Sequence, residues 1–110
     1  MTFLNILYLF LKFKEDENEL YQTKDSINGD CSIFALKLYD YYSEKGYNPN
    51  INVLNKDIHF WINIGSYFID GRGVFKSQND IIHCFKKYVV RERIDVISRD
   101  NLCKYILKKK

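Results

Sequence analysis

Three residues of types that together support nucleophilic catalysis occur in the chain in the order Cys31, His59, Asp70. A cysteine attacks a carbonyl carbon as its thiolate, and an adjacent imidazole takes the thiol proton and later protonates the leaving group. A carboxylate hydrogen-bonded to that ring fixes its tautomer. The three residues therefore predict hydrolysis or acyl transfer at an amide or acyl carbonyl, provided that the fold brings them together.

The cysteine falls at the start of a helix predicted over residues 30–46, with Asp30 as its N-cap. The buried stripe of this helix is predicted at helical spacing: Phe34, Ala35, Leu38 and Tyr42. A thiol in the first turn lies at the positive end of the helix dipole, which favours the thiolate. Backbone N–H groups there can hold an oxyanion, and Asn28 and Gln22 are alternative side-chain donors between which the sequence does not choose.

The histidine and the aspartate belong to a β-hairpin predicted within residues 57–73, with Gly65-Ser66 as its loop. A two-residue loop places Ile64 opposite Tyr67. Alternation then puts five side chains on one face: His59, Trp61, Asn63, Phe68 and Asp70. The imidazole and the carboxylate are diagonal neighbours in this register, whereas a one-residue bulge would place them on opposite faces.

Each of these residues also has a structural interpretation. A cysteine at a helix start is more often a small buried residue, a strand histidine beside a tryptophan is more often packed, and an aspartate before Gly71 forms turns. Their order and their shared hairpin favour the catalytic interpretation. Asp57 is a second candidate for the orienting carboxylate, and Trp61 is a candidate substrate contact.

The segments around the three residues resemble papain-like and transglutaminase-like cysteine enzymes, and are similar in layout to short bacterial and phage proteins. Residues 29–35, Gly-Asp-Cys-Ser-Ile-Phe-Ala, are similar to the nucleophile helix of these enzymes, and His59-Phe60-Trp61 and residues 67–73 to their histidine and aspartate strands. The resemblance spans residues 28–75. It implies Cys31 as nucleophile, His59 as base and Asp70 as orienting residue, a protein or peptide substrate, and no cofactor.

The order of predicted elements is a helix within residues 1–22, the helix over 30–46, the hairpin, and a helix–strand–helix unit over 78–110. This order predicts one α+β domain with a small antiparallel sheet of about three strands. The sheet is expected to pack against the cysteine-bearing helix and two or three further helices. Residues 47–55 are predicted as a loop, and the last strand is predicted over residues 89–97.

The net charge of +3 is unevenly distributed, at −4 over residues 1–70 and +7 over residues 71–110. The candidate residues for binding nucleic acid or a protein partner are Lys86, Lys87, Arg91 and Arg93. No nucleic-acid motif accompanies them, and a solvated face is the simpler interpretation. They keep open an alternative function, a non-catalytic interaction or inhibitor module of the same fold that binds a host protein or nucleic acid.

Three irregularly spaced cysteines argue against a disulfide framework and predict a reducing, cytoplasmic location. No metal is expected, because cysteines and histidines lack the spacing of structural zinc sites. The apolar run of residues 2–13 is too short to span a bilayer and lacks the features of a secretory signal, so no membrane association is expected. It predicts a helix buried on several sides, by the core or by a second copy in a homodimer.

Overall fold

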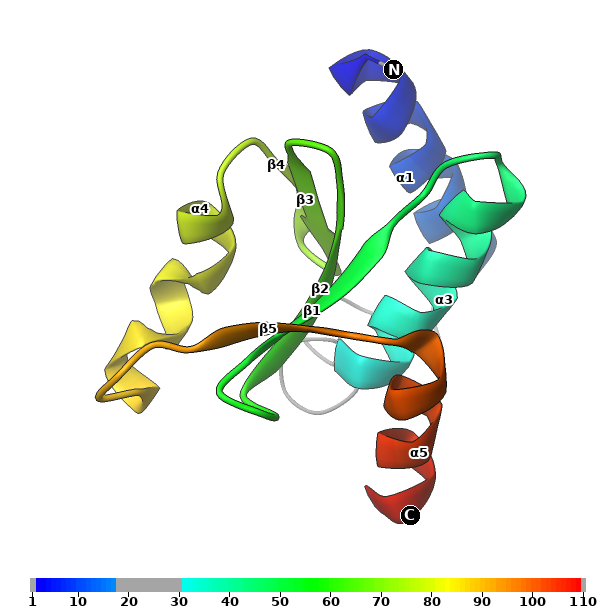
Figure 1. The fold of residues 1–110 in the computed structure, drawn as a ribbon. Helices are drawn as coiled ribbons and strands as arrows, with labels where there is room; N and C mark the ends of the chain where they lie inside the picture. Colours follow the sequence, from blue (N-terminus) through cyan, green and yellow to red (C-terminus); the bar gives the residue numbers. More distant parts are fainter. Residues whose placement is uncertain (1, 18–30, 110) are drawn as a thin grey trace.

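The computed structural model describes residues 2–17 and 31–109, in which a five-stranded antiparallel sheet carries helices on both faces (Figure 1). The strands are β1 (Asn50–Leu54), β2 (His59–Ile64), β3 (Tyr67–Asp70), β4 (Gly73–Phe75) and β5 (Ile94–Ile97), in the sheet order β4-β3-β2-β1-β5. The helices are α1 (Phe3–Glu17), α3 (Cys31–Glu44), α4 (Gln78–Ile82), the 3₁₀ helix η2 (His83–Tyr88) and α5 (Arg99–Lys109). The predicted α+β class is confirmed.

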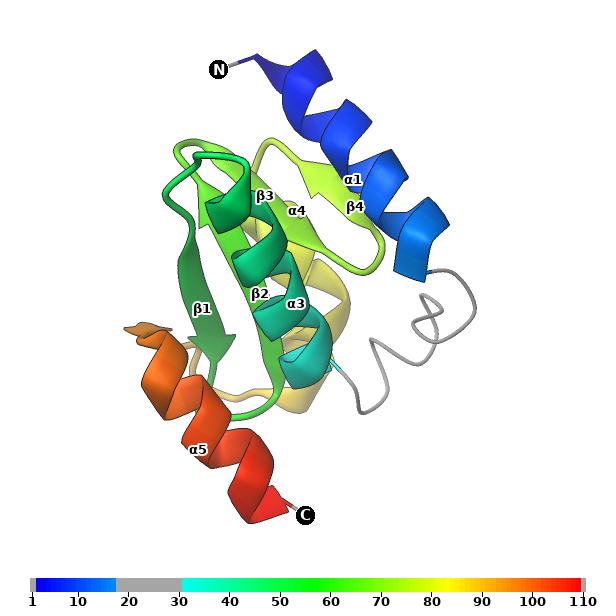
Figure 2. The same cartoon turned by 90° about the vertical axis from the view of Figure 1, so that its right-hand side faces the viewer.

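The helices form a layer on each side of the sheet. Figure 2 shows α3 along one face with α1 and α5 to its sides, while α4 and η2 lie behind the strands. Side chains alternate along the strands, so Phe60 and Ile62 enter the core under α3, whereas Trp61 enters the core under α4 and η2. The predicted stripe of α3 is confirmed, since all four of its members are buried.

The β2–β3 hairpin has the predicted register, with Ile64 opposite Tyr67 and Ile62 opposite Ile69. Gly65 adopts a φ of 57°, which an L-residue with a Cβ adopts at a cost, so glycine suits this loop position. The hairpin contains no bulge between Ile62 and Tyr67. His59 and Asp70 therefore lie on the same face of the sheet, as the alternation predicts.

The prediction of about three strands was too low, because it placed β1 in a loop and included no strand over residues 73–75. β1 lies between β2 and β5 and is buried from Ile51 to Leu54. Its one buried polar side chain, Asn52, donates from Nδ2 to Oδ1 of Asn63 at 2.8 Å. A five-residue strand after Asn-Pro-Asn has little local signature, and both of its partners lie further along the chain.

The last predicted strand is shorter than expected. A strand was predicted over residues 89–97, but β5 begins only at Ile94. Helix η2 extends to Tyr88, and residues 89–93 connect it to β5. Arg91 and Arg93 therefore precede β5 and do not lie within the strand.

Helix α1 buries one side and exposes the other, which corrects the expectation of burial on several sides. Ile6, Phe10 and Phe13 enter the core, while Leu4, Tyr8 and Leu11 are exposed. The predicted helix extends to residue 22, but residues 18–22 lie outside the described part. No helix among the described residues has the length and apolarity needed to cross a membrane. The homodimer through this helix stays a prediction.

Candidate active site

The hairpin brings His59 and Asp70 into direct contact. The Nε2 atom of His59 lies 2.8 Å from Oδ2 of Asp70, and the side chains are 1% and 2% exposed. His59 begins β2 and Asp70 ends β3, so both lie at the same end of the hairpin. This is the diagonal contact that the two-residue loop predicts.

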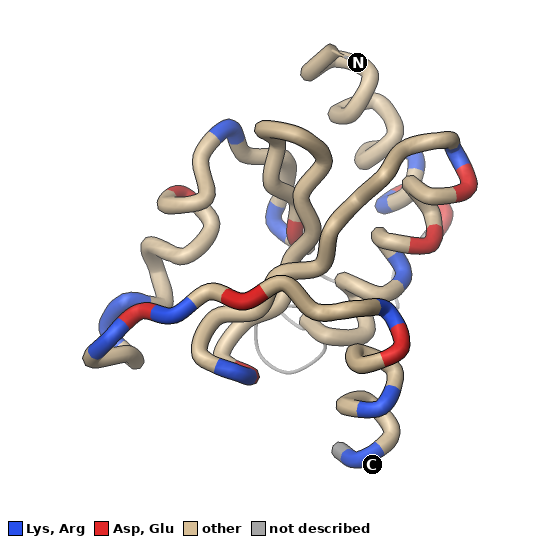
Figure 3. Tube along the Cα trace, viewed as in Figure 1, with Lys and Arg blue, Asp and Glu red and all other residues tan. Residues whose placement is uncertain are grey.

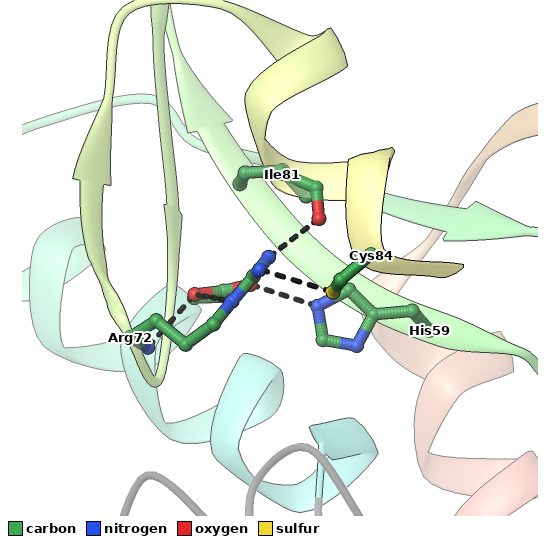
Figure 4. Close-up of polar contacts among 5 residues, drawn as sticks. His59, Arg72, Ile81 and Cys84 are labelled. Atoms are coloured by element: carbon green, nitrogen blue, oxygen red, sulfur yellow. Dashed lines mark hydrogen bonds and ion pairs between the residues drawn. The ribbon is translucent and has the colours of Figure 1, made fainter. Parts of the chain in front are cut away.

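Arg72 forms a second set of contacts with the same carboxylate. Its Nε and Nη2 atoms lie 3.0 and 2.6 Å from Oδ2 of Asp70, and its backbone N–H donates to Oδ1 at 2.8 Å. The guanidinium also donates to the carbonyl of Ile81 and contacts Sγ of Cys84 at 3.2 Å (Figure 4). Arg72 thus connects the carboxylate to α4 and η2.

Charge and hydrogen bonding keep the carboxyl of Asp70 ionised. Burial would raise the pKa of the Asp70 carboxyl, but hydrogen bonds from His59 and Arg72, together with their positive charges, hold this pKa below its ordinary value. An ionised carboxylate accepts hydrogen bonds only, so Nε2 of His59 carries the proton that faces it. The other ring nitrogen, Nδ1, is buried without a hydrogen-bond partner among the described residues.

Aromatic rings hold the imidazole in place. Phe85 of η2 stacks on the imidazole with ring centroids 4.3 Å apart. Trp61 also stacks on it, with ring centroids 5.9 Å apart. Trp61 is fully buried, and its contact with substrate stays a prediction. Asp57, the alternative orienting carboxylate, is exposed in the turn between β1 and β2, and Asp70 occupies the position beside the ring.

Cys31 begins α3, as predicted, and is 8% exposed. Its side chain belongs to the core under α3, whereas the ring of His59 stacks on η2 across the sheet. The first turn of α3 and the β1–β2 turn lie at the same end of the sheet in both views (Figures 1 and 2). The starts of α3 and β2 thus lie at one end of the sheet, and the side chains of Cys31, His59 and Asp70 are all buried.

The remaining predicted site residues fall into two groups. Asn28 and Gln22, the candidate oxyanion donors, and Asp30, the candidate N-cap, fall outside the described residues. Lys86, Lys87, Arg91 and Arg93 are exposed on η2 and its connection to β5; Arg93 contacts Asp95 at 3.0 Å.

Arg72 is the residue that sequence reasoning missed. The available signal was its place two residues after Asp70, because an aspartate in a turn accepts the N–H at that position. The further contacts with Ile81 and Cys84 depend on how α4 and η2 pack, which no local pattern encodes.

Within residues 2–17 and 31–109, no three histidine, cysteine or acidic side chains lie close enough together to hold a metal ion. Comparison of the chain with models of protein families, with curated proteins and with solved structures finds no match. The geometry of the site is therefore the basis for assigning a function to the chain.

Proposed function

We propose that the chain is a minimal cysteine hydrolase or acyltransferase that uses Cys31, His59 and Asp70. The observation that carries this proposal is the buried pair of His59 and Asp70, in which the carboxylate holds Nε2 and leaves Nδ1 as the basic atom. A general base needs one nitrogen that is oriented and one that has no other hydrogen-bond partner, and Nδ1 has none among the described residues. The placement of Cys31 at the first turn of α3 supplies the candidate nucleophile at the same end of the sheet.

The proposed reaction starts with transfer of the Cys31 proton to Nδ1 of His59. The thiolate then attacks the acyl carbonyl carbon, the carbonyl oxygen becomes an oxyanion, and N–H groups of the first turn of α3 stabilise it. Collapse of this intermediate expels the amine, which takes the proton from Nδ1 and leaves a thioester on Cys31. Water or a second amine, deprotonated by Nδ1, attacks the thioester and releases the thiol.

The geometry sets one requirement for this reaction. Because Cys31 packs under α3 and His59 stacks on η2, the sulfur and Nδ1 must meet beyond the start of β2 rather than across a face of the sheet. Substrate must reach them at the same end of the sheet.

The pH dependence of Cys31 alkylation tests the proposal. Cys84 is exposed and Cys103 half-buried, so iodoacetamide rates are measured in a Cys84→Ser/Cys103→Ser background. We expect Cys31 to react well below the pH of about 8.5 at which an ordinary thiol ionises, because the imidazole stabilises the thiolate. His59→Gln, which keeps a donor for Asp70, should shift the profile up towards about 8.5.

Two carboxylate variants serve as a matched pair for that measurement. Asp70→Asn should slow alkylation at neutral pH while the circular dichroism spectrum stays native, and Asp57→Asn should leave the rate unchanged. An ordinary thiol profile that His59→Gln does not alter would contradict the enzyme proposal.

The alternative is the non-catalytic interaction module. The burial of Cys31, His59 and Asp70 favours it, because a buried, fully packed ion pair also occurs where its function is only structural. The exposed apolar side chains of α1, namely Leu4, Tyr8 and Leu11, would then belong to a docking face. An ordinary Cys31 profile would support this alternative.

A further inference from the structure

A second feature lies beside the candidate active site, along α5. This helix packs beside the first turns of α3 in both views (Figures 1 and 2). The ring of Tyr105 lies 5.0 Å from that of Phe60, the residue after His59, and Tyr105 packs against the core that contains Cys31. Burial, followed by electrostatic repulsion from Asp57 and Cys31, raises the pKa of Tyr105.

A hollow of about 630 Å³ opens against this helix, which is within the size range of ligand sites. The described residues that line it are Asn101, Lys104, Tyr105, Leu107 and Lys108. Tyr105 and the exposed Leu107 give it an apolar floor, and Lys104 and Lys108 place two ammonium groups at its rim. None of these lining residues is acidic.

Lys104 and Lys108 are both exposed on α5. Neither forms an ion pair with a carboxylate among the described residues. They are four residues apart on one helix, where like charges repel each other and destabilise the helix. An anionic partner in the hollow would relieve this repulsion. Figure 3 shows that the basic residues of α5 are separate from those on the η2–β5 connection.

We propose that this hollow binds an acidic peptide segment of the acyl substrate, with its carboxylates on Lys104 and Lys108 and its apolar side chains on Tyr105 and Leu107. The inference rests on the proposed function for the identity of the bound peptide as substrate. A peptide suits the mixed lining better than a nucleic acid does, because the exposed leucine offers contact to an aliphatic side chain and the ammonium groups donate to a carboxylate.

Fluorescence anisotropy with a labelled short peptide of alternating glutamate and leucine tests binding directly, without reference to catalysis. The matched peptide carries glutamine in place of glutamate. At physiological ionic strength we expect the acidic peptide to bind at least about tenfold more tightly than the glutamine peptide. Lys104→Gln/Lys108→Gln should weaken binding of the acidic peptide by about tenfold.

The control is Lys12→Gln/Lys45→Gln, which removes the same charge from exposed positions on α1 and after α3. It should change the affinity less than about twofold. Equal losses in the two double variants, or equal binding of the two peptides, would overturn the inference. Tighter binding of a single-stranded oligonucleotide, lost in the Lys104→Gln/Lys108→Gln variant, would also overturn it and identify nucleic acid as the ligand.

A second measurement separates this inference from the proposed function. Bound acidic peptide should slow the alkylation of Cys31 in the wild-type chain at least about threefold by covering the same end of the molecule, but not in Lys104→Gln/Lys108→Gln. Absence of this protection overturns the assignment of the peptide to the acyl substrate. If Cys31 proves an ordinary thiol but α5-dependent binding persists, the enzyme proposal fails and the hollow stands as a peptide-docking site.

Discussion

Asp70 is the acceptor on which the candidate site depends. It takes hydrogen bonds from the imidazole of His59 and from both the side chain and the backbone of Arg72. A carboxylate that is 2% exposed loses nearly all of its hydration, and these donors replace it. Because Arg72 donates to both oxygens of the carboxylate, it restrains the direction in which Oδ2 faces the ring. Arg72 thus helps to fix the tautomer of His59, although it makes no hydrogen bond to His59 itself.

The lowered pKa of Asp70 predicts how stability changes in acid. A carboxylate whose pKa is lower in the folded state than in the unfolded state stabilises the fold above its unfolded pKa of about 3.9. This contribution is lost as the pH falls from about 4 through the folded value. Asp70→Asn should therefore cost about 2 kcal/mol at neutral pH, and the difference from wild type should shrink below pH 4. Urea unfolding across this pH range measures it.

Arg72→Lys is the informative companion to that experiment. A lysine retains the positive charge but not the planar fork, so it should recover only part of the acid-dependent stability. A difference between wild type and Asp70→Asn that stays constant down to pH 2 would show that the carboxylate is not held in its ionised form by these partners.

At the scale of the elements, the hairpin fixes the distance between the imidazole and the carboxylate. Shifting β2 against β3 by one residue would move Asp70 to the opposite face from His59. The loop sets this register, and its Gly65 has a φ of 57°. Gly65→Ala should lower the free energy of unfolding by about 1–2 kcal/mol, because a Cβ is disfavoured in this conformation. Chemical denaturation measures the change.

Ser66→Ala, at the neighbouring exposed loop position, is the control and should stay within about 0.5 kcal/mol of wild type. If Gly65→Ala is equally neutral, the loop does not depend on its glycine, and the register must be held by side-chain packing of the two strands alone.

The hairpin was predictable because its determinants are close in sequence. Alternation over residues 59–64 and a glycine loop specify which residues share a face, and the contact between His59 and Asp70 follows. The start of α3 and its buried stripe were predictable for the same reason. β1 was not, because its role in the sheet depends on β5, about forty residues later in the sequence, and on a side-chain pair between Asn52 and Asn63.

The contacts around the site could not be predicted from local sequence patterns either. Arg72 reaches the carbonyl of Ile81 only because α4 packs over the sheet, and Phe85 stacks on His59 only because η2 continues α4 along the same face. These contacts join segments through tertiary packing. They determine the burial of the pair.

In the whole molecule, the two helical layers meet the sheet through different chemistry. The layer of α4 and η2 carries the ion pair and its aromatic neighbours, whereas the layer of α1, α3 and α5 is joined largely by apolar packing. Lys14 of α1 nonetheless donates to the carbonyl of Gly71 at 3.3 Å, in the turn after Asp70. The position of α1 therefore affects the turn beside the site. This position depends in turn on how α1 is attached to α3.

That attachment includes a buried hydrogen bond, in which the hydroxyl of Tyr42 donates to the carbonyl of Ile6 at 2.8 Å. Burial, followed by repulsion from Tyr41 and Tyr47, raises the pKa of Tyr42 well above its ordinary value. The hydroxyl thus stays protonated in the folded chain, while the unfolded chain loses this proton above about pH 10. Stability should fall as the pH rises from about 10 towards the folded value, with a contribution from Tyr42 of at most about 1.4 kcal/mol per pH unit.

Tyr42→Phe separates the two effects of this hydroxyl. At neutral pH the variant should lose about 1 kcal/mol, because the bond to Ile6 is absent. Above pH 10 its stability should fall less steeply than that of wild type, because one tyrosine that ionises only on unfolding has been removed. Tyr8→Phe, at an exposed position of α1, should match wild type at neutral pH within about 0.5 kcal/mol. Equal alkaline slopes in wild type and Tyr42→Phe would mean that the hydroxyl reaches solvent, so that α1 separates from α3 before the sheet unfolds.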